Sequence, residues 1–155
     1  FGDSVFHVYA PWDLPGSVRR FLGNVRPKLL VLIERELWPN MIYQTHGIGC
    51  HIMLVNARLS ERSARHYARF SSLATSMLTS LNIVVCQSEG DARRFTMLGL
   101  SPKKIIVTGG AGDIGRSVCD YFLENNLKKS KLCLIHMGSF VLSINYKADV
   151  QEHTQ

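Results

Sequence analysis

Short apolar runs alternate with segments of helical periodicity along most of the chain. The predicted strands are Val5–Tyr9, Leu29–Ile33, Ile52–Val55, Ile83–Cys86, Ile105–Thr108 and Leu132–Ile135. The run Leu29–Ile33 is apolar at every position, which is typical of a strand buried on both faces of a sheet. The predicted helices between these runs cover Ser17–Leu22, Pro39–His46, Ser60–Phe70, Ser72–Leu81, Ser88–Leu98 and Asp113–Asn125. Residues 137–155 lack clear periodicity, and we assign them no element.

This alternation of strands and helices predicts the fold class and the edge where a ligand binds. It indicates an α/β, Rossmann-like, mainly parallel sheet with helices on both faces. Ligands of such sheets bind beyond the carboxyl ends of the strands. The loops of interest are therefore Glu34–Trp38, Asn56–Ser60 and Thr108–Gly115.

Composition narrows the class of partner. The 155 residues carry 18 Lys+Arg against 12 Asp+Glu, a net charge of +6, and 46% are hydrophobic. This favours a globular domain with an anionic partner such as a phosphate group, a nucleotide or a lipid head group, and we expect no nucleic-acid partner. No apolar run approaches the ~20 residues of a membrane span, and no signal peptide is evident. The start at Phe1 indicates that upstream residues are missing.

The cysteines and histidines give no metal signal. Four widely spaced cysteines show no metal-ligand spacing, and we expect reduced, buried thiols in a cytoplasmic protein. His46, Cys50 and His51 are close in sequence, but a zinc site needs three or four converging ligands and no fourth candidate is apparent. We predict no metal site.

Two carboxylates, Glu34 and Glu36, follow the buried strand Leu29–Ile33 directly. A carboxylate between a strand end and a helix N-terminus can be desolvated and its pKa tuned. The two point to opposite sides if the chain stays extended, so a paired acid and base is not expected. The structural alternative is that one carboxylate caps the helix at Pro39 while Arg35 forms a surface ion pair. Trp38 either stacks on a sugar or lipid, or packs at the helix start.

Several sequence pieces resemble one family in the same order. They are the stretch 26–40, which contains Glu34-Arg-Glu-Leu-Trp-Pro-Asn40, then Val55-Asn-Ala-Arg-Leu-Ser60 with Arg62-Ser63, Gln87-Ser-Glu-Gly-Asp91 with Arg94-Phe95, Leu98-Gly99 and Val107-Thr-Gly109. Together they resemble the N-terminal domain of the bacterial 3-deoxy-D-manno-octulosonic acid (Kdo) transferases, over roughly residues 8–109.

The resemblance implies part of the N-terminal domain of a two-domain, inverting GT-B glycosyltransferase. Such an enzyme transfers Kdo from CMP-Kdo to a lipid A precursor in lipopolysaccharide biosynthesis, as a peripheral protein at the cytoplasmic face of the inner membrane. Its N-terminal domain receives the acceptor, and its C-terminal domain binds the donor. Glu34 matches an acidic position that supports the transition state, by orienting an acceptor hydroxyl or stabilising developing positive charge.

Parts of the family pattern are absent from these residues. The family's general base lies in an upstream Ser-x-Gly-Glu loop, a lysine follows its Val-Thr-Gly, and a donor domain comes after it, yet none of these occurs here. An inverting transfer needs a base and a held leaving group, so we expect the chain to be inactive alone. We also expect the missing first strand–helix unit to leave an open sheet edge.

A basic stripe follows the third predicted strand. Arg58, Arg62, Arg65 and Arg69 lie within about 60° of one another if the helix begins near Arg58, at ~100° per residue. Arginine suits phosphate, so Arg58, Arg62 and Arg65 are candidates for binding the acceptor or an anionic membrane surface. The alternative is a solvated helix face with Glu61 and Glu89 nearby.

A glycine-rich loop allows a second function. Gly110, Gly112 and Gly115 form G-x-G-x-x-G after a predicted strand, and residues 107–126 resemble the first unit of an extended short-chain dehydrogenase/epimerase. The implied cofactor is NAD(P), although the acidic residue expected after the next strand is replaced by His136. The alternatives are a nucleotide- or anion-binding remnant and a packing turn.

These resemblances divide the chain into a partial Kdo-transferase-like domain (1–109), a glycine-rich βα unit (110–136) and an unpatterned tail (137–155). A degraded gene, a frameshift or a natural fusion would each produce the junction near Gly109.

Overall fold

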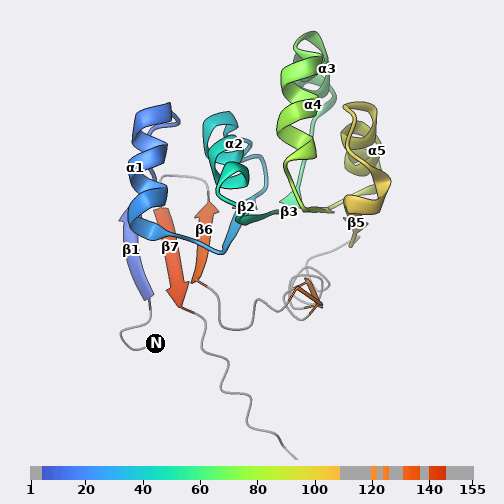
Figure 1. Cartoon of the computed structure of the whole chain (residues 1–155). Helices are drawn as coiled ribbons and strands as arrows, with labels where there is room; N and C mark the ends of the chain where they lie inside the picture. The colour runs from blue at the N-terminus through green and yellow to red at the C-terminus, as the bar shows by residue number, and fades with distance from the viewer. Residues whose placement is uncertain (1–4, 109–119, 122–123, 126–130, 137–139, 146–155) are drawn as a thin grey trace, which may run out of the picture.

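The protein is described by a computed structural model over residues 5–108, 120–121, 124–125, 131–136 and 140–145 (Figure 1). Its strands are β1 (Val5–Tyr9), β2 (Leu29–Ile33), β3 (His51–Ala57), β4 (Ile83–Cys86), β5 (Ile105–Val107), β6 (Lys131–His136) and β7 (Phe140–Asn145). Over these described segments they form one sheet in the order β1-β7-β6-β2-β3-β4-β5.

The sheet is mainly parallel. β6, β2, β3, β4 and β5 pair in parallel, whereas β7 pairs antiparallel with both β6 and β1. β2 lies near the centre and has a parallel neighbour on each side, which explains why all five of its residues are apolar. The predicted α/β, Rossmann-like fold class is confirmed.

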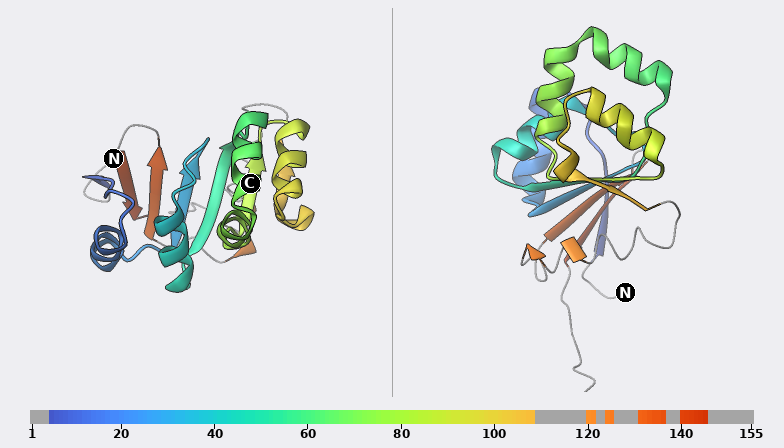
Figure 2. Two further views of the ribbon diagram at one scale, coloured as in Figure 1. Left: turned by 90° about the horizontal axis from the view of Figure 1, so that it is seen from above. Right: turned by 90° about the vertical axis from the view of Figure 1, so that its right-hand side faces the viewer.

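We predicted helices on both faces, and among the described elements the five α-helices lie on one side of this sheet, as Figures 1 and 2 show. They are α1 (Pro15–Val25), α2 (Pro39–Gly47), α3 (Glu61–Arg69), α4 (Ser71–Thr79) and α5 (Glu89–Met97). α3 and α5 begin where predicted, because Ser60 and Ser88 each accept a hydrogen bond from a backbone N–H in the first turn. α5 is followed by Gly99, whose φ of +97° is available to glycine at little cost.

The main core fills the space between these helices and the sheet. Leu30, Leu32, Ile52 and Leu54 on the strands meet apolar side chains of α1, α2, α4 and α5, including the fully buried Phe95. α3 contributes no buried residue. The opposite sheet face carries a second cluster of Leu29, Val31, Met53, Val55 and Val85 with Tyr121.

One expectation about the end of the chain needs correction. Residues 140–145 form β7, although we assigned no element beyond residue 136; β7 pairs with its neighbour β6 and also with β1, which is far away in sequence, so local periodicity did not reveal it. The edge strands of the described sheet are β1 and β5. The predicted helix Asp113–Asn125 lies largely outside the described residues.

Candidate functional site

The carboxyl ends of β2 and β3 meet at Glu34 and Asn56. Hydrogen bonds join the two segments where these strands end. Glu34 N–H donates to the Val55 carbonyl at 2.9 Å, and Arg58 N–H donates to the Glu34 carbonyl at 3.3 Å. The Asn56 amide donates to Glu34 Oε1 at 3.5 Å. The half-buried Glu34 carboxylate is thus held at the edge where ligands of parallel sheets bind.

The backbone at this point is strained. Glu34 has φ +63° and Asn56 has φ +52°, and Arg26 is the one other non-glycine residue with positive φ in the described part of the chain. The β3–β4 register also shifts between Leu54 and Ala57, as at a β-bulge. Strained residues of this kind cluster at functional sites and persist where surrounding bonds hold them.

The roles of Asn56 and Asp13 were not predicted from the sequence. Asparagine tolerates the left-handed region better than most residues, so its place in Val55-Asn-Ala-Arg was a usable signal. Asp13 gave no local signal, because it acts on a helix 27 and 28 residues away: its carboxylate accepts from the N–H groups of Asn40 at 3.2 Å and Met41 at 2.9 Å.

The cap formed by Asp13 contradicts the alternative in which Glu34 or Glu36 caps the helix at Pro39. Neither glutamate caps α2, since Asp13 does so, and Glu36 instead accepts from the Trp38 indole N–H at 2.5 Å. Arg35 forms no ion pair with any described residue, because the one ion pair there is Arg94–Asp91. The Glu34 carboxylate thus has no capping role that would explain its placement.

The basic stripe is only partly as predicted. The helix begins at Glu61 rather than near Arg58, because Ser60 is its N-cap, so Arg58 is not on the helix face. The Arg58 backbone instead donates a hydrogen bond to Glu34. Its side chain is exposed and does not line the hollow on α3 that is described next.

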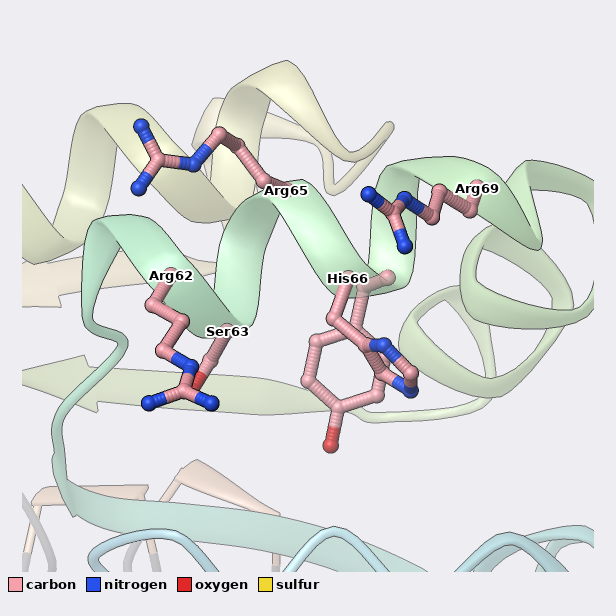
Figure 3. Close-up of a pocket in the computed structure, with 6 residues that line it drawn as sticks. Arg62, Ser63, Arg65, His66 and Arg69 are labelled. Atoms are coloured by element: carbon pink, nitrogen blue, oxygen red, sulfur yellow. The ribbon is translucent and has the colours of Figure 1, made fainter.

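The remaining arginines do share a surface on α3. Arg62, Arg65 and Arg69, with His66, line a hollow of about 520 Å³ (Figure 3). Arg62 and His66 extend along the same side of the helix, while Arg65 projects from its other edge. All four side chains are exposed, and none of the arginines pairs with Glu61, Glu89 or any other carboxylate of the described segments. We call Arg62, Arg65, His66 and Arg69 the α3 basic face.

Thiol and imidazole chemistry find little support here. Cys50 and Cys86 are free and buried, and burial raises the pKa of each thiol to about 12, so neither forms a nucleophilic thiolate near neutral pH. The ring of His51 is hydrogen-bonded through Nδ1 to the Tyr121 hydroxyl at 2.8 Å. Over the described ranges, no three histidine, cysteine or acidic side chains gather as metal ligands.

Gly110, Gly112 and Gly115 lie outside the described residues. Within the described part, no helix is long and apolar enough to cross a bilayer.

The fold and the strand-end carboxylate define a class: a Rossmann-like domain of the kind that forms the N-terminal half of GT-B glycosyltransferases. A family model described as 3-deoxy-D-manno-octulosonic-acid transferase (kdotransferase) matches residues 1–111. The chain belongs to this family, as the resemblance predicted.

Individual relatives agree with the family match. The chain is 40% identical over 109 residues to 3-deoxy-D-manno-octulosonic acid transferase of Haemophilus influenzae, covering 70% of this chain and 26% of the relative. It is 30% identical over 131 residues to a probable mitochondrial 3-deoxy-D-manno-octulosonic acid transferase of Arabidopsis thaliana, a match that covers 81% of this chain and 28% of the relative. A bifunctional glycosyltransferase/methyltransferase of Fusobacterium nucleatum is 37% identical over 98 residues, which are 63% of this chain and 15% of that relative. The match thus covers between 15% and 28% of the length of these relatives.

Proposed function

We propose that this chain forms the acceptor side of an inverting glycosyltransferase that transfers Kdo from CMP-Kdo to a lipid A precursor. The observation that carries the proposal is the position of Glu34. Its carboxylate is held by β3 at the carboxyl edge of the sheet, within the stretch that matches the Kdo-transferase family.

In such a transfer an acceptor hydroxyl attacks the anomeric carbon of Kdo, and CMP leaves with the electrons of the broken C–O bond. The Glu34 carboxylate would orient that hydroxyl or stabilise positive charge developing on the sugar. A fixed carboxylate suits either role, because it needs no reorganisation during the reaction.

The hydroxyl proton must pass to a base, which the resemblance places in a Ser-x-Gly-Glu loop. The 155 residues contain no such sequence. The purified chain, given CMP-Kdo and the precursor, is therefore expected to transfer no Kdo. Robust transfer would contradict this expectation and require a base among the residues present.

The α3 basic face is the proposed site for the acceptor's phosphates or for the anionic inner leaflet. Arginine forks match phosphate oxygens, and these arginines have no carboxylate partner among the described residues. The location that follows is peripheral, at the cytoplasmic face of the inner membrane.

The direct test is binding of the 155-residue chain to phosphatidylcholine vesicles with and without lipid A precursor, measured by co-sedimentation. We expect R62E/R65E to weaken precursor-dependent binding by about 30-fold or more, since each basic residue near an anionic surface contributes about 1 kcal/mol. R19E/R20E is the matched control, because Arg19 and Arg20 are an exposed pair on α1. Equal losses in both variants, or none in R62E/R65E, would contradict a site on α3.

A further inference from the structure

A second concave site lies at the carboxyl ends of β1 and β2. The cleft has a volume of about 560 Å³. It lies between the segment that follows β1 and the loop that follows β2. Its lining consists of Tyr9, Ala10, Pro11, Trp12, Asp13, Leu37, Trp38 and Pro39. We call these residues the aromatic cleft. Clefts of roughly 300–1,000 Å³ with aromatic walls and few polar groups are typical small-molecule sites.

Both walls of the aromatic cleft are fixed by hydrogen bonds. On one side, Asp13 accepts from two backbone N–H groups of α2, and the Asn40 side chain donates to the Asp13 carbonyl at 2.7 Å. On the other side, Glu36 holds the Trp38 indole N–H at 2.5 Å. The cleft is therefore preorganised, which lowers the ordering cost of binding.

The rings of this cleft are largely open to solvent. Trp12 is 84% exposed and Tyr9 is 79% exposed, while Trp38 is half-buried. An aromatic ring has a negative face that attracts weakly positive C–H groups. A pyranose ring offers such a face of C–H bonds and a rim of hydroxyls, so it suits a flat aromatic wall with carboxylates nearby.

Charge selects against an anionic ligand in the cleft. Asp13 lines it, Glu36 adjoins Trp38, and Glu34 precedes the same loop. No lysine or arginine is among the described lining residues, although the exposed Arg35 belongs to the loop. The α3 basic face has the opposite character. The charges of the described segments thus favour a neutral, hydroxyl-bearing ligand here and phosphate on α3.

We propose that the aromatic cleft binds an uncharged pyranose ring of the acceptor, stacked on Trp12 and hydrogen-bonded at its hydroxyl rim. Naming the ring as part of the acceptor rests on the proposed function; the sugar-binding chemistry does not. The cleft would then deliver the sugar to the edge where Glu34 lies, while the acceptor's phosphates reach α3.

Intrinsic fluorescence tests this directly, because the chain has two tryptophans, and both line the cleft. The 155-residue chain is titrated with N,N′-diacetylchitobiose, a neutral disaccharide. We expect a saturable change in tryptophan emission with a Kd in the millimolar range, which corresponds to a binding free energy of about −4 kcal/mol. Trp12→Ala should weaken binding by about tenfold, measured by the remaining Trp38 emission and by calorimetry. Tyr43→Ala is the control, since Tyr43 is 69% exposed on α2 outside the cleft.

The outcomes separate the two proposals. No saturable response, or equal affinity for the wild type and Trp12→Ala, would overturn the sugar site, even if precursor binding still depended on Arg62 and Arg65. A response to phosphatidylcholine vesicles but not to the disaccharide would also overturn it and indicate a membrane-interfacial loop. Disaccharide binding that needs Trp12, without precursor binding, would support the cleft and contradict the proposed acceptor.

Discussion

Glu34 and the arginines of α3 follow neighbouring strands of one sheet, yet their surroundings differ in burial and in hydrogen bonding. Glu34 is half-buried, its backbone N–H and carbonyl both form hydrogen bonds with β3 or the residue just beyond it, and its φ is +63°. α3 has no buried residue, and its arginines are exposed without carboxylate partners in the described part of the chain.

This difference separates two kinds of functional group. A carboxylate that acts on a reacting atom must be held in place, and neighbouring strands hold it at a cost in backbone strain. Cations that attract a phosphate act over a longer range and tolerate a mobile side chain. If this holds, the Glu34 region is rigid and contributes to stability, whereas the arginines of α3 contribute charge and little stability.

The largest expected difference is in amide hydrogen exchange. Amides of β2 and β3 should exchange only through global unfolding, whereas those of α3 should exchange through local opening and be faster by about a thousandfold or more. Exchange measured by NMR on the wild-type chain checks this. Comparable protection of α3 and β2 would show that α3 is as firmly held as the sheet.

Asp13→Ala should cost about 1–2 kcal/mol of the free energy of unfolding, because two N–H groups at the start of α2 lose their acceptor. Ser60→Ala removes the matching cap of α3 and should cost less, since α3 has no fully buried residue. Urea unfolding of both variants measures the difference. A larger loss for Ser60→Ala would reverse the ranking of the two regions.

Glu34→Gly should be more stable than Glu34→Ala by about 1 kcal/mol, because glycine accepts positive φ without the strain of a Cβ. Glu36 is the control, since it is not a positive-φ residue; there the glycine variant should be the less stable one. Thermal unfolding of the four variants tests this. The same ranking at both positions would refute strain at Glu34.

The smallest effect is expected on α3. Arg62→Ala and Arg69→Ala should each change the free energy of unfolding by less than about 0.5 kcal/mol, because both side chains are exposed and unpaired with acid in the described segments. Both variants should still bind anionic vesicles more weakly than the wild type does. A stability loss above 1 kcal/mol would mean that these arginines have a structural role.

Features governed by neighbouring residues were predictable from the sequence. β2 and β4 have the predicted bounds, and the Ser60 and Ser88 caps are confirmed, because apolar periodicity and capping act within a few residues. Glu34 was a candidate from its place after a buried strand and from the family resemblance. Its role in transfer stays a prediction.

Features set by distant residues were not predictable in the same way. The Asp13 cap of α2 and the Asn56 contact with Glu34 depend on how elements pack, and the strand β7 pairs on one side with the distant strand β1. Arg58 was placed on the α3 face because the helix start was set too early. Because Ser60 is the N-cap and α3 begins at Glu61, Arg58 lies three residues before the helix.

The strand order also has a consequence for the time at which the protein can assemble. β1 is made long before its partner in the sheet, β7, at residues 140–145. A ribosome adds about 5–20 residues per second, so β1 waits for about 7–27 seconds until that partner is synthesised. β2, β3 and β4 can pair in order during this interval. β1 therefore joins the sheet only after β2, β3 and β4 have had time to pair, and the nascent chain needs protection at β1 until then.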